Sequence, residues 1–170
     1  MLEEFLRPYF AHSGELIVRM ITFNLITCVT HKQYEQQATA FATDMGKMDS
    51  HNILFTLTSH SEDDWGNLMI GMSCQKRLEV ASTVEMVLDV LLTPFEKITS
   101  DSVFIMFACR AIVNKVKSFD QFCASITRYG CLLYTFSHCL TSSRDSGLHL
   151  LSHLMWFVSI RAPAGPAWYS

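Results

Sequence analysis

The chain has 170 residues and a formal net charge of −3 with its histidines neutral, and this length predicts one domain over residues 1–170. Hydrophobic residues make up 49% of the chain and charged residues only 17%. The hydrophobic fraction is high enough for a large buried core. The sequence has no long basic run, which argues against a nucleic-acid-binding protein. The low charged fraction fits either an excess of core or an apolar surface kept for a partner.

Cysteine usage indicates a reducing, intracellular compartment. None of the cysteines forms a C-x-x-C pair, and most have apolar neighbours, as buried free thiols do. The chain opens with Met1-Leu2-Glu3-Glu4, which is acidic where a secretory signal would be basic. The six cysteines are Cys28, Cys74, Cys109, Cys123, Cys131 and Cys139.

Helical periodicity predicts an all-α fold in which a central apolar helical hairpin is wrapped by amphipathic helices. Glycine and proline are sparse, with 7 and 4 residues. The helices expected before the hairpin cover residues 2–11, 15–30, 33–46 and 50–59. The hairpin itself covers 65–80 and 82–98. The helices expected after it cover 101–117, 119–128, 130–140 and 147–160, with a loop at 142–147.

The helix over 82–98 has the clearest pattern. Ser82-Thr83-Val84-Glu85 has the form of a capping box, in which Ser82 and Glu85 each satisfy a free backbone N–H. Pro94 is expected to kink the last turn because it removes a backbone donor. One apolar stripe follows the helix through Val84, Val87, Leu88, Leu91, Leu92 and Phe95.

The last apolar stretch, 148–160, is too short to cross a membrane, which takes about 20 apolar residues, so we expect a packed helix and no transmembrane anchor. His149 and His153 stand four residues apart on that helix and could share a zinc ion. The metalloprotease glutamate is missing between them and no third ligand is marked, so no metal site and no cofactor are expected.

Two local pairs of cysteine and histidine leave a catalytic dyad open. Cys28 lies three residues before His31, and His138 adjoins Cys139. With so many histidines and cysteines such pairs also arise by chance, and no local signature accompanies either pair. We therefore predict no catalytic residues and no enzyme.

The segment 61–72 carries the most specific pattern in the chain. The acids Glu62, Asp63 and Asp64 suit the positive end of a helix dipole, and Trp65-Gly66 then opens a very apolar run. Glycine in a first helical turn costs roughly 0.5–1 kcal/mol against alanine. It is tolerated either because another element approaches the backbone closely or because Gly66 relieves crowding beside the Trp65 indole.

Residues 64–70, Asp-Trp-Gly-Asn-Leu-Met-Ile, are similar to the first homology motif of the Bcl-2 family, which reads Asn-Trp-Gly-Arg and opens the central helix of an all-α bundle. The segment 5–12 is similar to the family's first helix, and 118–122 resembles its second motif, usually Gly-Gly-Trp-Asp-x-Phe. The chain departs from the family at three places. Asp64 stands where the first motif has asparagine, and Asn67 stands where it has arginine. Residues 117–119 are Lys-Ser-Phe where the second motif has Gly-Gly-Trp. The segment 38–44 is the one candidate for the family's third homology motif. Short, anchorless members of this kind resemble viral homologues.

The resemblance implies a pro-survival protein, anti-apoptotic in a host cell's cytoplasm or peripherally at mitochondria. It would sequester the amphipathic death-motif helix of pro-apoptotic Bcl-2 family proteins in a surface groove. Asn67 in place of arginine would offer a neutral hydrogen bond, of about 1 kcal/mol against about 1.5–3 for a charged one, and so weaker binding. The groove residues implied are Leu54, Thr58, Asp64, Trp65, Gly66, Asn67, Met69, Ile70, Cys74 and Phe119.

Two alternatives from other classes remain open. One is a structural or interaction helical bundle, homodimeric and without a peptide groove, to which the low surface charge also fits. The other is an all-α enzyme or metal protein that uses His149, His153 or a cysteine. Peptide binding separates the groove protein from both, and native mass and metal analysis separate the other two.

Overall fold

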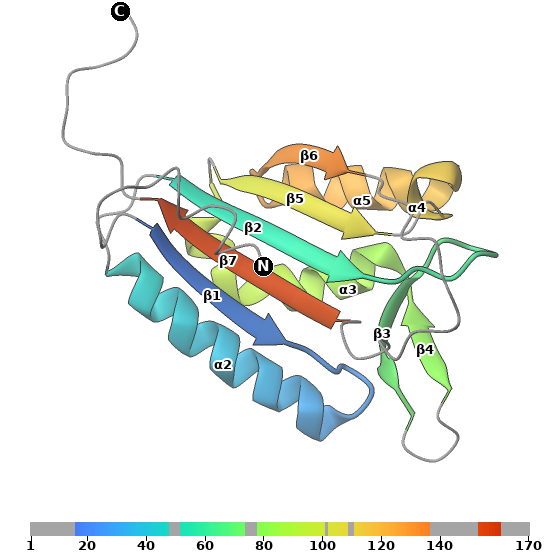
Figure 1. Ribbon diagram of the computed structural model, residues 1–170, viewed down its shortest axis with the longest axis horizontal. Coiled ribbons are helices and arrows are strands. Elements are labelled where there is room, and N and C mark those ends of the chain that lie inside the picture. Colours follow the sequence, from blue (N-terminus) through green and yellow to red (C-terminus); the bar gives the residue numbers. More distant parts are fainter. Residues whose placement is uncertain are drawn as a thin grey trace, which may run out of the picture.

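The computed structural model describes residues 16–47, 52–73, 78–100, 102–108, 111–136 and 153–160. Strands and helices are mixed along these residues (Figure 1). In chain order they are β1 (Leu16–Thr22), α2 (Cys28–Gly46), β2 (Asn52–Ser59), β3 (Leu68–Met72), β4 (Glu79–Ser82), α3 (Val84–Leu92), the 3-10 helix η2 (Thr93–Ile98), β5 (Val103–Ala108), α4 (Ala111–Asn114), α5 (Val116–Arg128), β6 (Leu132–Phe136) and β7 (His153–Ile160).

Five of these strands form one sheet in the order β1-β7-β2-β5-β6. β5 runs parallel to both β2 and β6, and β7 runs antiparallel to both β1 and β2. The strands β1, β2, β5 and β6 therefore all point the same way, and β7 alone is reversed between β1 and β2 (Figure 1). The carboxyl ends of four strands consequently meet at one edge of the sheet.

β3 and β4 form a separate two-stranded antiparallel sheet beyond that edge (Figure 1). The pairing shifts by one residue between Met69 and Gly71, which is a β-bulge. Gly71 has a φ of +150°, and a Cβ built on it would lie 2.6 Å from the Asn24 side-chain oxygen. This tight contact holds the small sheet against the segment between β1 and α2.

The described helices pack on one face of the large sheet. Phe55 and Phe104 are register partners on β2 and β5, so their rings share a face. The Phe55 ring lies 5.7 Å from that of Phe95 in η2, and the Phe104 ring lies 6.1 Å from that of Phe122 in α5. Phe41 of α2 also meets Phe95, at 6.1 Å, in an edge-to-face geometry favoured by aromatic quadrupoles. These contacts make one core from α2, η2, α5 and the sheet; Figure 1 shows α3 and α5 behind the strands and α2 alongside β1.

The prediction of an all-α Bcl-2-like bundle is wrong, because the chain has a mixed α/β fold. Short apolar runs without polar interruptions are typical of strands covered on both faces, and over so few residues they cannot be told from buried helix by periodicity. The central hairpin fails for the same reason, since its first arm is the β3–β4 pair. The ranges predicted as helix that contain strands are 15–30, 50–59, 65–80, 101–117, 130–140 and 147–160.

The helices predicted over 33–46, 82–98 and 119–128 are confirmed. The range 82–98 holds α3 and η2, 33–46 lies within α2, and 119–128 lies within α5. All six stripe residues of 82–98 are buried. The capping box expected at Ser82 is absent, because the N-cap is Thr83 and makes no side-chain cap bond. The helix predicted at 2–11 lies outside the described residues.

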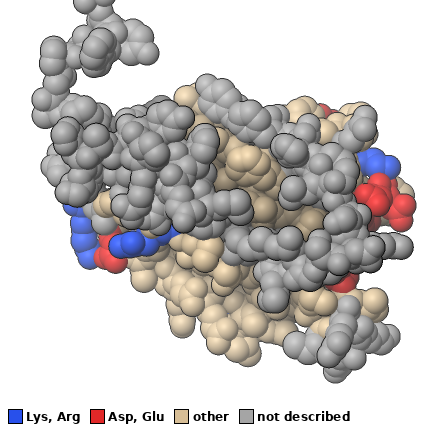
Figure 2. All heavy atoms as spheres, viewed as in Figure 1, with Lys and Arg blue, Asp and Glu red and all other residues tan. Residues whose placement is uncertain are grey.

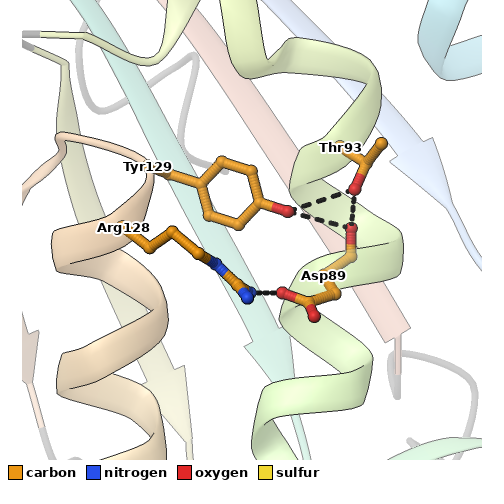
Figure 3. A network of polar contacts seen from close by, with 4 residues as sticks. All are labelled: Asp89, Thr93, Arg128 and Tyr129. Carbon is orange, nitrogen blue, oxygen red and sulfur yellow. Dashed lines mark hydrogen bonds and ion pairs between the residues drawn. The ribbon is translucent and has the colours of Figure 1, made fainter.

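A polar network joins α3 to the end of α5 (Figure 3). Asp89 of α3 forms an ion pair with Arg128. Thr93 donates to the Asp89 carbonyl oxygen at 2.6 Å, and its hydroxyl lies 3.1 Å from that of Tyr129. The Arg128 guanidinium also lies 5.3 Å from the centre of the Tyr129 ring. Because the charged groups of the pair are partly exposed, the network orients the two helices more than it stabilises the fold.

Tyr34 links α2 to α3 through a buried hydrogen bond. Its side chain is 2% exposed, and its hydroxyl donates to the Leu91 carbonyl oxygen at 2.7 Å. Burial raises the pKa of Tyr34 above its usual value, because the phenolate would lose its solvation. The neutral hydroxyl is therefore the form that the fold requires.

Tyr34→Phe is expected to lower the free energy of unfolding by about 1–2 kcal/mol at pH 8, because the Leu91 carbonyl loses its donor. In the unfolded chain the tyrosine ionises near pH 10, whereas in the folded protein its pKa is higher. The contribution of Tyr34 to the free energy of unfolding is therefore fully present below pH 10 and decreases as the pH rises above 10. Urea unfolding at pH 8 and pH 11 measures both proteins. The difference between them should shrink at pH 11, and an equal difference at both pH values would contradict the assignment.

Candidate functional site

The carboxyl edge of the parallel strands brings together two segments that are far apart in sequence. β2 and β5 are neighbours, and Ser59 at the end of β2 pairs in register with Ala108 at the end of β5. The next residue of the first strand is His60, and the next residue of the second is Cys109. Cys109 lies outside the described residues.

The main chain at His60 is held by a compact set of hydrogen bonds while its side chain is exposed. The His60 carbonyl oxygen accepts from the Met69 N–H at 2.8 Å. Ser59, which is buried, has its hydroxyl 3.0 Å from the Met69 carbonyl and 3.1 Å from the His60 carbonyl. The first strand of the small sheet thus fixes the backbone from which the imidazole extends.

A closed turn over 62–67 follows His60 and leads into β3. The Glu62 N–H donates to the Asn67 carbonyl at 2.9 Å, and the Gly66 N–H donates to the Glu62 carbonyl at 3.0 Å. Asn67 also reaches the Glu62 carboxylate with its side-chain amide, at 3.4 Å. The outer residues of the turn are exposed, and Trp65 is 71% exposed.

Gly66 is covered by its own chain. Its φ is +72°, a conformation that favours glycine, and a Cβ built on it would lie 3.1 Å from the Ala111 carbonyl oxygen and 3.2 Å from the Ser118 hydroxyl. The Ser118 hydroxyl donates to the Trp65 carbonyl at 2.6 Å. The glycine therefore admits the close approach of α4 and the start of α5, and no helix begins at Trp65.

The residues implied for the groove lie on several different elements. Leu54 and Thr58 are on β2, in the middle of the large sheet, and Met69 and Ile70 are on β3. Phe119 is on α5 and packs against the core from there. The turn carries Asp64, Trp65, Gly66 and Asn67, and Cys74 lies outside the described residues. None of the described helices begins at Trp65, so the apolar central helix from which the groove was inferred is absent among the described elements.

The histidines and cysteines singled out in the sequence are distributed differently. His153 is the first residue of β7, where its backbone pairs with Ser59, and His149 lies outside the described residues with His138 and Cys139. The helical face proposed for zinc therefore does not form around His153. Cys28 and His31 share the first turn of α2. Within the described ranges there is no group of three or more His, Cys, Asp or Glu side chains that could hold a metal ion.

Two described thiols sit in surroundings that disfavour the thiolate. Burial raises the pKa of Cys131, although a hydrogen bond from Ser102 at 3.2 Å opposes this. Burial and the nearby Asp120 carboxylate raise the pKa of Cys123. Both side chains are thereby kept as neutral thiols, which are poor nucleophiles.

The charged side chains coloured in Figure 2 lie mostly toward the two ends of the view. Acidic and basic side chains gather at the end toward which β2 and β5 point, and a second group lies at the opposite end. The exposed acids Asp63 and Asp64 belong to the turn after His60. The turn beside the carboxyl edge thus carries exposed acidic side chains.

Protein-family models, curated protein sequences and solved structures were compared with this chain, and none matches it. No helix in the described ranges is both long enough and apolar enough to pass through a membrane.

Proposed function

We propose that the chain is a cysteine-dependent hydrolase whose nucleophile is Cys109 and whose general base is His60. The observation that carries the proposal is the in-register parallel pairing of Ser59 with Ala108. In the sequence, His60 directly follows the first of these residues and Cys109 directly follows the second. In open α/β sheets the carboxyl ends of parallel strands are where ligands bind.

The chemistry needs both residue types together. A free cysteine has a pKa near 8.5, and a neighbouring imidazolium favours the thiolate, which is the reactive form. The thiolate would attack the carbonyl carbon of an ester or amide and form a thioester, while the imidazolium donates its proton to the leaving alcohol or amine. Water, deprotonated by the imidazole, would then hydrolyse the thioester and restore the thiol.

Two further observations support this assignment. The His60 carbonyl oxygen accepts from Met69 of β3, and the residue is exposed, so a substrate could reach it from solvent. Cys123 and Cys131 are kept as thiols by their surroundings, so neither competes as the nucleophile.

Inhibition of apoptosis by a helix-binding groove stays a prediction. It was inferred from a helix opening at Trp65, and Gly66 lies instead in a turn covered by α4 and α5. The sequence pattern alone favours no enzyme, and the pairing of β2 with β5 is what supports one.

Selective alkylation tests the proposal. The full chain is treated with iodoacetamide at pH 6.5, and mass spectrometry follows each of the six cysteines over time. Cys109 is expected to react at least about tenfold faster than Cys28, an exposed thiol that serves as the internal reference. A Cys109 that reacts no faster than Cys28 would overturn the proposal.

A further inference from the structure

Trp65 presents a large aromatic side chain to solvent from a fixed main chain. The residue is 71% exposed. Its carbonyl oxygen accepts from the Ser118 hydroxyl at 2.6 Å, and the N–H of the next residue, Gly66, donates to the Glu62 carbonyl at 3.0 Å. A folded chain ordinarily covers most of an indole, because its burial removes a large apolar area from water. An indole held out on a rigid turn is suited to binding a partner, since the turn loses little conformational freedom on association.

The start of α5 adds a second exposed apolar side chain beside this turn. Val116, the first residue of α5, is 75% exposed. The residue before it, Lys115, lies against the turn, because a Cβ built on Gly66 would be 3.1 Å from the Lys115 Cγ. Trp65 and Val116 therefore belong to two segments that are in contact, and each segment leaves an apolar side chain uncovered.

Charges of opposite sign accompany the two segments. Asp63 and Asp64 directly precede Trp65 and are exposed, whereas Lys115 and the exposed Lys117 stand at the start of α5. Within the described part of the chain, none of these four charged side chains forms an ion pair. Figure 2 shows basic and acidic side chains next to one another at the end toward which β2 and β5 point. The turn thus carries unpaired negative charge and the start of the helix carries unpaired positive charge.

We propose that these two segments form an interface with a second copy of the chain. A two-fold axis beside Trp65 would place the acidic turn of each copy on the basic helix start of the other, so that both halves are complementary at once. A partner with charge of one sign would be attracted by one half and repelled by the other. The indoles would be covered near the axis, where the residues that dominate binding usually lie. We call this interface the Trp65 surface, and its members are Asp63, Asp64, Trp65, Lys115, Val116 and Lys117.

Sedimentation equilibrium of the full chain, from about 1 to about 200 µM, tests the proposal over a range that covers weak and tight association. A species of twice the 19.4 kDa chain mass is expected to grow with concentration. A chain that stays monomeric over the whole range would leave the Trp65 surface to a partner of another kind and overturn the proposal. The experiment measures mass alone, so no outcome bears on the proposed hydrolase.

Trp65→Ala is expected to raise the dissociation constant of the dimer at least about 30-fold, as the loss of a central aromatic residue does. The main-chain bond to Ser118 remains in this variant, so the turn keeps its place. Val29→Ala is the matched control, because Val29 is 66% exposed but lies on α2, alongside β1. Its dissociation constant should equal that of wild type. A dimer that Trp65→Ala does not weaken would overturn the proposal.

Charge reversal tests the arrangement of the two copies. One variant combines Asp63→Lys with Asp64→Lys, and the other combines Lys115→Glu with Lys117→Glu, which keeps the Cγ atom that lies against Gly66. Each variant alone would bring like charges together and should stay monomeric at concentrations where wild type is dimeric. An equal mixture of the two should form heterodimers, because the lysines of one variant then meet the acids of the other. Circular dichroism verifies folding, and folded variants that stay monomeric when mixed, or that dimerise alone as wild type does, would overturn the proposal.

Discussion

His60→Ala is expected to lower the rate of thiol-dependent ester hydrolysis by about 10²- to 10⁴-fold, the contribution of a positioned general base. Under the proposed function, the reason is that His60 directly follows β2, whose last residue pairs with Ala108, the residue before Cys109 in the sequence. Without the imidazole, the thiol would keep its proton at neutral pH and the leaving group would receive none. Hydrolysis of a nitrophenyl ester by the full chain, followed by absorbance, measures the effect.

His31→Ala is the matched control for this experiment. It removes a half-buried histidine from the first turn of α2, which is not part of the carboxyl edge of β2 and β5. Its rate should equal that of wild type. An equal loss in both variants, or no loss in His60→Ala while Cys109→Ala is inactive, would remove His60 from the proposed mechanism.

Phe95→Ala is expected to lower the free energy of unfolding by about 3–5 kcal/mol, the usual cost of truncating a buried phenylalanine. Its ring is fully buried and lies between those of Phe41 and Phe55, which come from α2 and β2. The cavity would open where helix, 3-10 helix and sheet meet, and these elements cannot all move in to fill it. A domain of this size is stable by about 5–15 kcal/mol, so the loss is a large fraction.

Chemical denaturation at 25 °C measures the change, and Met86→Ala provides the comparison. Met86 lies on the neighbouring helix α3 but is 62% exposed, so its truncation should change the stability by less than about 0.5 kcal/mol. Similar small losses in both variants would show that the core is not centred on Phe95.

The sequence predicts the helices of this fold better than its strands. Residues 82–98 alternate buried and exposed side chains with a period near 3.6, and this signal survives in α3 and η2. β5 carries no such signal because its residues are apolar on both faces, and in β2 three consecutive apolar residues precede the polar Thr56 and Thr58. Ile53 to Leu57 and Val103 to Phe107 therefore resemble interior helix, and only the pairing of distant segments distinguishes the two.

The candidate site is hidden from sequence for a related reason. His60 and Cys109 are almost fifty residues apart, and neither is part of a local motif. The only signal available was that each residue closely follows a segment rich in apolar, β-branched and aromatic residues, which is typical of a strand. The Trp65–Gly66 pair did mark a special backbone position, but its cause is the approach of α4 and α5 and not a visiting helix.

The placement of β7 between β1 and β2 has a consequence for biosynthesis. Among the described strands β1 pairs only with β7, and residue 16 lies opposite residue 160. Almost the whole described chain must leave the ribosome before its first strand can dock, so the nascent chain presents unsatisfied strand edges and apolar surface throughout translation. Contacts between such distant residues slow folding, and the partly folded chain can aggregate in the meantime. We therefore expect this topology to depend more on chaperones than a helical bundle of equal length does.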